Sequence, residues 1–90
     1  MTGKERAEKR KEANGLETIF QIGKEDIGEN MISAIDSALK KRELIKLSVL
    51  KNCALSAKEA ASVLSEELNA EIILCIGRKF VLYRRNQEEL

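Results

Sequence analysis

The stretch Ile22-Gly23-Lys24-Glu25-Asp26-Ile27-Gly28 joins two segments of different periodicity and therefore decides how the chain is organised. Residues 18–22 before it, Thr-Ile-Phe-Gln-Ile, are typical of a β-strand, and from about residue 29 apolar residues recur at helical spacing. A strand-to-helix turn with a glycine at either side is predicted. Such a turn can hold a phosphate against the free amide groups of the helix start, with Lys24 as the cation. The simpler explanation is that Gly23 permits the turn and Gly28 caps the helix.

The segments on either side of this turn alternate between helix and strand. Residues 2–13 begin with the capping box Thr2-x-x-Glu5 and are predicted to form a helix that ends at Asn14-Gly15. This helix is poor in apolar residues, so it either docks through alanines and the stems of basic residues or frays. Residues 43–50 alternate between apolar and polar, which predicts a strand with one wet face.

The last third of the chain predicts a helix followed by a hairpin. A second capping box, Ser56-x-x-Glu59, opens the helix and Asn69 is a plausible C-terminal cap. Residues 72–76 are continuously apolar, as in a central strand, and Gly77-Arg78 suits a type II′ turn to a strand over residues 79–84. The order α-β-α-β-α-β-β favours parallel pairing of the first strands, with the hairpin adding an antiparallel one. We predict a two-layer α/β (α+β) sandwich with a four-stranded mixed sheet.

Length and composition limit the possible functions. Ninety residues with 43% apolar content form one small domain, and 16 basic against 15 acidic residues leave a charge of only +1. Any preference for a polyanion must therefore come from the distribution of charge. The polar N-terminus and the absence of a long apolar run predict a soluble, unprocessed, cytoplasmic protein that does not associate with membranes.

Residues suited to catalysis or metal binding are scarce. The sequence has no histidine, and its two cysteines, predicted at a strand edge (Cys53) and in a buried strand (Cys75), form no CxxC pair. The acids Glu25, Asp26 and Glu29 at a helix start are explained by the helix dipole. We therefore expect no enzyme activity, no metal or other cofactor and no small-molecule substrate. With only three aromatic residues, any nucleic-acid binding should rest on phosphate and shape contacts.

Four blocks in order resemble the signature of the CRM domain (chloroplast RNA splicing and ribosome maturation), in particular its free-standing bacterial YhbY-like form. They are Thr2-Gly3-Lys4-x-Arg6-x-x-x-Arg10, Ile22-Gly23-Lys24, Arg42-Glu43-Leu44-Ile45-Lys46 and Ile76-Gly77-Arg78-Lys79-Phe80-Val81-Leu82-Tyr83-Arg84. The resemblance implies a single RNA-binding domain over residues 1–85, with residues 86–90 as a loose tail, and a fold like the C-terminal domain of translation initiation factor three. It also implies association with precursors of the large ribosomal subunit.

The resemblance also indicates which residues would contact RNA. They are Lys4, Arg6, Lys9, Arg10, Gly23, Lys24, Lys46 and Arg84. Of these, Lys24, Lys46 and Arg84 are also explained as ordinary exposed cations. Arg6 and Arg10 are four residues apart and should share one helical face.

Two positions depart from the family pattern. Asp26 stands where the Gly-x-x-Gly loop has its second glycine, which places negative charge where a phosphate would approach. Repulsion at such a surface site is on the order of 1 kcal/mol and is screened by salt, so the loop is expected to be weakened rather than abolished. Lys9 stands where the family has an apolar residue and should leave the first helix more basic and less well anchored.

The sequence leads to two functional hypotheses. The first is a non-enzymatic protein that binds structured ribosomal RNA in large-subunit precursors and assists ribosome assembly. The alternative is a small protein-interaction module of the same fold with little RNA affinity, which the near-neutral net charge and the acids of the glycine turn favour. Basic residues gathered on one face would support the first, and basic residues dispersed among acids the second.

Overall fold

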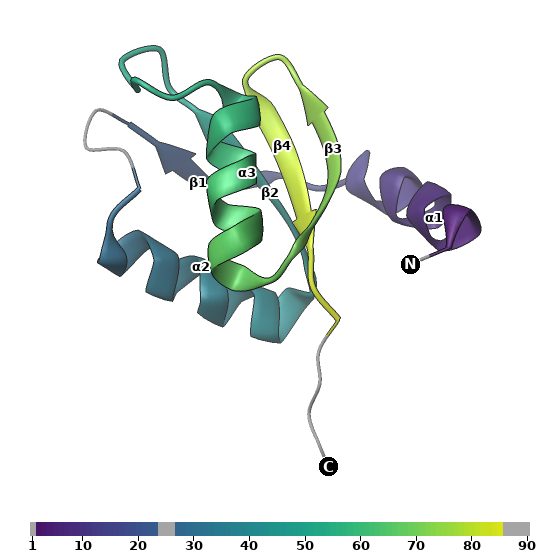
Figure 1. The fold of residues 1–90 in the computed structure, drawn as a ribbon. Helices are drawn as coiled ribbons and strands as arrows, with labels where there is room; N and C mark the ends of the chain where they lie inside the picture. The colour runs from purple at the N-terminus through teal and green to yellow at the C-terminus, as the bar shows by residue number, and fades with distance from the viewer. Residues whose placement is uncertain (1, 24–26, 86–90) are drawn as a thin grey trace.

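The computed structural model describes residues 2–23 and 27–85, and within them the predicted order of helices and strands is confirmed (Figure 1). The elements are α1 (Gly3–Ala13), β1 (Thr18–Ile22), α2 (Glu29–Arg42), β2 (Leu44–Val49), α3 (Ala57–Leu68), β3 (Glu71–Ile76) and β4 (Lys79–Tyr83). The predicted tail over residues 86–90 lies outside the described residues. None of these helices is both long enough and apolar enough to span a membrane.

Local signals in the sequence fix several element ends. Both capping boxes form: the Thr2 and Ser56 side chains accept hydrogen bonds from the backbone N–H three residues on, and the Glu5 and Glu59 carboxylates accept hydrogen bonds from the backbone N–H of Thr2 and Ser56. Asn69 ends α3 in the left-handed conformation, with φ of 55°. At the hairpin only Gly77 has a positive φ, 60°, which matches the type II′ turn that was predicted.

The sheet has the strand order β1-β2-β4-β3. The β1–β2 pair is parallel, whereas β4 runs antiparallel to both β2 and β3 between which it lies. The prediction that residues 72–76 form a central strand is wrong, because β3 is an edge strand. Its far end is open: Cys75 is exposed rather than buried, and Ile76 is 67% exposed.

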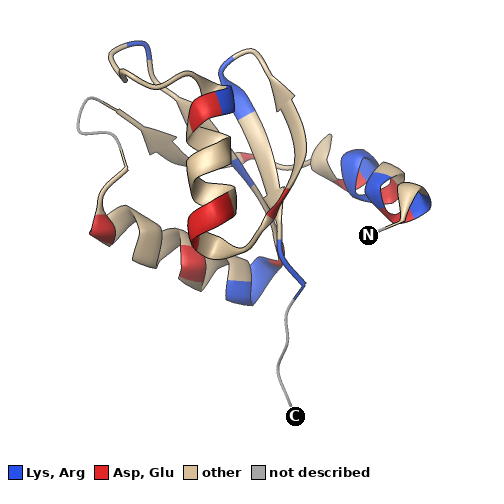
Figure 2. Cartoon of the chain, viewed as in Figure 1, with Lys and Arg blue, Asp and Glu red and all other residues tan. Residues whose placement is uncertain are grey.

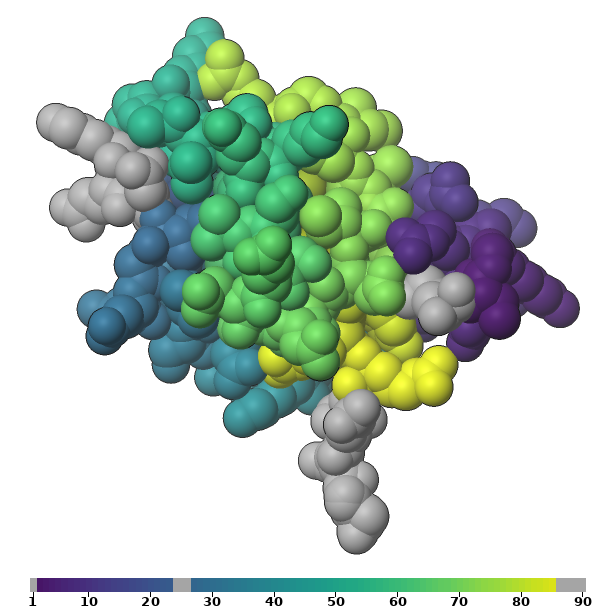
Figure 3. Space-filling model, in the orientation of Figure 1, coloured from purple at the N-terminus to yellow at the C-terminus, as the bar shows by residue number. Residues whose placement is uncertain are grey.

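One face of the sheet carries the main core and forms the predicted two-layer sandwich with α2 and α3. Ile35 and Leu39 of α2 and Leu64 of α3 are fully buried against sheet residues such as Leu47 and Phe80. Figure 3 shows α3 lying over the sheet on this side and α1 at the edge of the view. Most of the buried apolar surface, and hence most of the hydrophobic stabilisation, belongs to this face.

The second face of the sheet is covered only at one end, by α1 and the segment after it. Ala13 is buried there against Leu44, Ile73, Val81 and Tyr83. Figure 1 shows α1 beside β3, on the side of the molecule away from α2. The helix therefore docks rather than frays, although Ala13 is its single buried residue.

Candidate nucleic-acid interface

Helix α1 is rich in basic residues, which are coloured blue in Figure 2. Lys4, Arg10 and Lys11 are exposed, and none of them has an ion-pair partner within residues 2–23 and 27–85. A cation without a carboxylate partner keeps its full charge available to an incoming anion. This end of the molecule therefore offers more positive charge to a phosphate than the near-neutral net charge of the chain suggests.

The other two basic residues predicted on α1 turn toward the sheet. The Arg6 guanidinium donates to the Ile72 backbone oxygen at 3.1 Å and to Glu71 Oε1 at 3.0 Å. Lys9 Nζ lies 4.8 Å from the centre of the Tyr83 ring, the geometry of a cation–π contact, and 3.7 Å from a Glu12 carboxylate oxygen. The Lys9 side chain thus helps to hold α1 on the sheet; that it anchors the helix less well than an apolar residue stays a prediction. Arg6 and Arg10 also differ in environment, although they are four residues apart.

The glycine turn lies at the opposite end of the sheet from α1. Gly28 is the N-cap of α2 and provides no side-chain hydrogen bond to the first amide groups of the helix. Gly23 follows β1 with no positive φ, and a Cβ built on it would lie 3.4 Å from Leu50 Cδ1. The backbone therefore does not require glycine at position 23. The predicted contact residue Lys24, with Glu25 and Asp26, lies outside the described residues.

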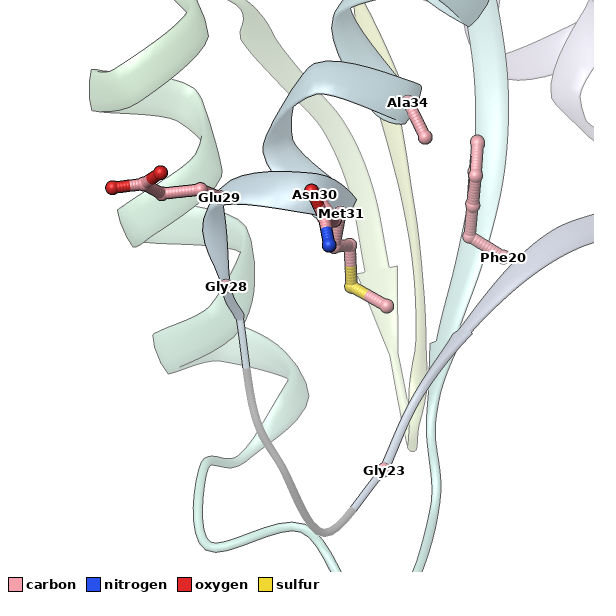
Figure 4. A pocket seen from close by; sticks show the side chains of 7 residues that line it. All are labelled: Phe20, Gly23, Gly28, Glu29, Asn30, Met31 and Ala34. Atoms are coloured by element: carbon pink, nitrogen blue, oxygen red, sulfur yellow. The ribbon is translucent and has the colours of Figure 1, made fainter.

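An open hollow of about 670 Å³ lies between β1 and the start of α2 (Figure 4). Its floor is apolar: Phe20 of β1 faces Met31 and Ala34 of α2, and Gly23 and Gly28 form its rim. Glu29 also lines the rim, but its carboxylate points away from the hollow in Figure 4. The hollow therefore has an apolar floor beside the start of α2, and the Glu29 carboxylate at its rim points away from it.

Arg84 is directed into the helical layer rather than outward. Its guanidinium donates to Asp36 Oδ1 at 2.8 Å, to the Asp36 backbone oxygen at 3.1 Å and to the Leu68 backbone oxygen at 3.0 Å. The hydrogen bond from Arg84 holds the pKa of Asp36 below its ordinary value, despite the opposing effect of partial burial. Arg84 therefore joins the end of β4 to α2 and α3, a structural role that the sequence reasoning did not assign.

The seven predicted contact residues that the structure describes lie on separate elements. Lys4 and Arg10 are exposed on α1, Gly23 lies at the far end of the sheet, and Lys46 lies between them on β2. Other exposed cations outside the predicted set also lack ion-pair partners among the described residues; Lys11, Arg78 and Lys79 are three of them. The Gly77-Arg78-Lys79 hairpin could have indicated two of them, since a tight turn exposes its side chains.

The cysteines and acids of the described residues do not assemble into a metal site. No group of three potential ligands is close enough there to hold a metal ion. Cys53 is half-buried, and Cys75 is exposed on the open end of β3.

Comparisons with known proteins agree with the sequence resemblance. The chain is 40% identical over 88 residues to YqeI of Bacillus subtilis (strain 168), which is named as a probable RNA-binding protein; the match covers 98% of this chain and 92% of that protein. It is also similar to the solution structure of SAV1595 from Staphylococcus aureus, described as a candidate RNA-binding protein. The TM-score is 0.79 at 44% identity, covering 100% of this chain and 94% of the other. The family model of the CRS1 / YhbY (CRM) domain matches residues 1–84. The chain therefore belongs to the CRS1/YhbY (CRM) domain family.

Proposed function

We propose that this protein is a non-enzymatic, cytoplasmic RNA-binding protein that recognises structured RNA through its phosphate backbone. We propose further that its RNA is ribosomal RNA in precursors of the large subunit, whose assembly it assists. Membership of the CRM family and the names of its two relatives support the RNA-binding part. The ribosomal part rests on the resemblance of the sequence to YhbY-like proteins.

The observation that carries the proposal is the set of exposed, unpartnered cations on α1. Lys4, Arg10 and Lys11 stand on a helix whose other side is docked to the sheet. Three basic groups presented by one rigid element suit the closely spaced charges of an RNA backbone, which bind through the release of counterions. Described residues of the chain offer few aromatic side chains for stacking, so contacts to phosphate rather than to bases are expected.

The first test measures the affinity of the protein for a fluorescein-labelled RNA stem-loop across a salt series. Lys4→Ala/Arg10→Ala is compared with Lys41→Ala/Lys58→Ala, which removes two exposed cations from α2 and α3 instead. If both α1 cations contact phosphates, the first variant should bind more weakly and lower the salt slope by about 2. Equal weakening by the two variants would contradict a defined interface on α1.

A Gly23→Ala variant tests the glycine turn separately. Because a Cβ at this position meets only ordinary contacts, the fold should be retained, and the melting temperature checks this. A close approach of RNA backbone to Gly23 predicts a loss of affinity in the folded variant. Unchanged affinity would limit the role of Gly23 to the turn itself.

The ribosomal part is tested by cosedimentation of the tagged protein with ribosomal particles from a bacterial lysate. The protein should migrate with precursors of the large subunit at low salt and leave them as the salt concentration rises. A protein that binds the RNA stem-loop but stays at the top of the gradient would keep the RNA-binding part and exclude the ribosomal one. If it binds neither, the protein-interaction alternative gains support.

A further inference from the structure

The second face of the sheet has an uncovered half next to the part on which α1 docks. Strand register places Gln21 opposite Ser48, Ser48 opposite Lys79 and Lys79 opposite Ile76, which makes one row across all four strands. Directly opposed residues project to the same face of a sheet, so these four side chains share the face away from α2 and α3. Lys46, two residues before Ser48, projects from the same face. We call these five residues the open face.

The open face carries only positive charge. Lys46 pairs with Val81 across the strands and Lys79 lies two residues before Val81, so the two lysines are diagonal neighbours about 7 Å apart. No carboxylate occurs among the five residues, and neither lysine has an ion-pair partner among the described side chains. Like charges at this spacing repel each other, which disfavours the arrangement unless an anion bridges them.

The charges on the helical side differ. Helices α2 and α3 expose carboxylates beside their exposed cations, and Figure 2 shows red as well as blue segments on both helices. The exposed acids are Glu29, Glu59, Glu66 and Glu67, and the exposed cations are Lys40, Lys41, Arg42 and Lys58. A polyanion approaching from that side would meet carboxylates, whereas one approaching the open face would meet Lys46 and Lys79. The complementary charge therefore favours the second face.

The chemistry of the open face also limits which form of RNA it fits. Phe20 and Phe80 project into the helix-covered core, and Tyr83 lies under the Lys9 side chain, so no aromatic ring of the described residues lies on the open face. Sheets that bind single-stranded RNA stack bases on exposed rings. The exposed Lys79 and Gln21 and the half-buried Lys46 instead suit the phosphates and sugar hydroxyls of a double-stranded segment, whereas Ser48 is only 8% exposed.

We infer that the open face is a second contact surface for the backbone of double-helical RNA, with Lys46 and Lys79 on its phosphates. The inference rests on the proposed function and extends it, because Lys79 was not among the predicted contact residues. Lys46 lies between the cations of α1 and the glycine turn, so the open face would make these two distant contact regions parts of one surface.

The experiment compares the binding of Lys46→Ala/Lys79→Ala with that of Lys41→Ala/Lys58→Ala to a labelled RNA stem-loop across a salt series. The open-face variant should bind about tenfold more weakly and lower the salt slope by about 2, and the helical-side variant should bind as the wild type does. Lys46→Arg/Lys79→Arg should restore binding, since it returns both charges. An unpaired RNA strand of the same length should bind more weakly than the stem-loop, with little dependence on either lysine.

Three results would overturn the inference. If wild type binds the stem-loop and Lys46→Ala/Lys79→Ala binds equally well while remaining folded by circular dichroism, the open face is excluded and the proposed function stands. If the unpaired strand binds at least as tightly and depends on the same lysines, the double-helical partner is wrong. If wild type binds neither RNA at low salt, both the open face and the proposed function fail.

Discussion

The two faces of the sheet are built from different interactions. The helical face holds α2 and α3 through a continuous set of fully buried apolar side chains. The second face holds α1 through one buried alanine, an arginine on an edge carbonyl and a lysine on a tyrosine ring. Burial of apolar area sets stability, whereas exposed ionic contacts contribute little in water. The molecule thus separates a stable side from a side on which charge remains available for a partner.

A cavity in the helical core should give the largest loss of stability. Leu64→Ala removes a fully buried side chain of α3, and we expect it to lower the free energy of unfolding by about 3 kcal/mol. Urea denaturation measures this loss, with Lys58→Ala on the same helix as the surface control. A loss below about 1 kcal/mol would contradict the idea that the helical face contributes more to stability than the second face.

Removal of Arg84 should cost less than the cavity but more than any change on α1. Arg84→Ala removes the donor to the Leu68 carbonyl and to Asp36 Oδ1, while Lys40 stays 3.5 Å from Asp36 Oδ2. Hydrogen bonds to charged groups contribute about 2 kcal/mol. The neighbouring Arg85→Ala, which loses the contacts of an exposed side chain to Tyr83 and Glu5, is the matched control. Similar melting temperatures for the two variants would contradict the structural role of Arg84.

The same contact predicts a dependence on acid. Because the folded-state pKa of Asp36 lies below its ordinary value of 3.8, its contribution to stability is present above that value. It is lost as the pH falls through the folded-state pKa. The difference in unfolding free energy between wild type and Asp36→Asn should therefore narrow below about pH 4. A difference that stays constant from neutral to acid pH would show that the Asp36 carboxylate is not stabilised by Arg84.

The smallest effect is expected from the ionic docking of α1. Arg6→Ala removes a half-exposed ion pair and should lower the unfolding free energy by less than about 1 kcal/mol. Hydrogen exchange should instead show faster opening of residues 3–13, with unchanged protection of β2, because the loss is local. The Lys11 side chain makes no such contact, so Lys11→Ala should leave both the unfolding free energy and the hydrogen exchange of residues 3–13 unchanged. Global destabilisation as large as that of Leu64→Ala would mean that the two faces are one cooperative unit.

Local signals made most of the fold predictable, and non-local contacts account for what was missed. The capping boxes at Thr2 and Ser56 and the glycine of the hairpin act within a few residues, so the sequence alone reveals them. The apolar run of β3 suggested a central strand because register shifts between Ile72 and Leu74. Because of the one extra residue there, Ile72 faces the helices while Ile73 and Leu74 face the α1 side. Consecutive residues of the strand are therefore apolar although β3 lies at the edge of the sheet.

The candidate interface was less predictable for the same reason. Basic residues can be found in the sequence, but their partners cannot: Arg6 meets Glu71 and Arg84 meets Asp36 across long stretches of chain. These pairings turn two predicted contact residues into structural ones. Lys79 was passed over because its relation to Lys46 depends on the pairing of β4 with β2, which the sequence order does not reveal.

Interruptions in the two edge strands have a consequence for the solubility of the protein. One extra residue shifts the register of β1 between Thr18 and Phe20, as another does in β3, and the Arg6 guanidinium occupies the Ile72 carbonyl. An edge with a broken register and an occupied acceptor offers no continuous ladder for strand addition by another chain. The register shifts therefore disfavour the growth of intermolecular sheets from the outer strand that carries the exposed Ile76.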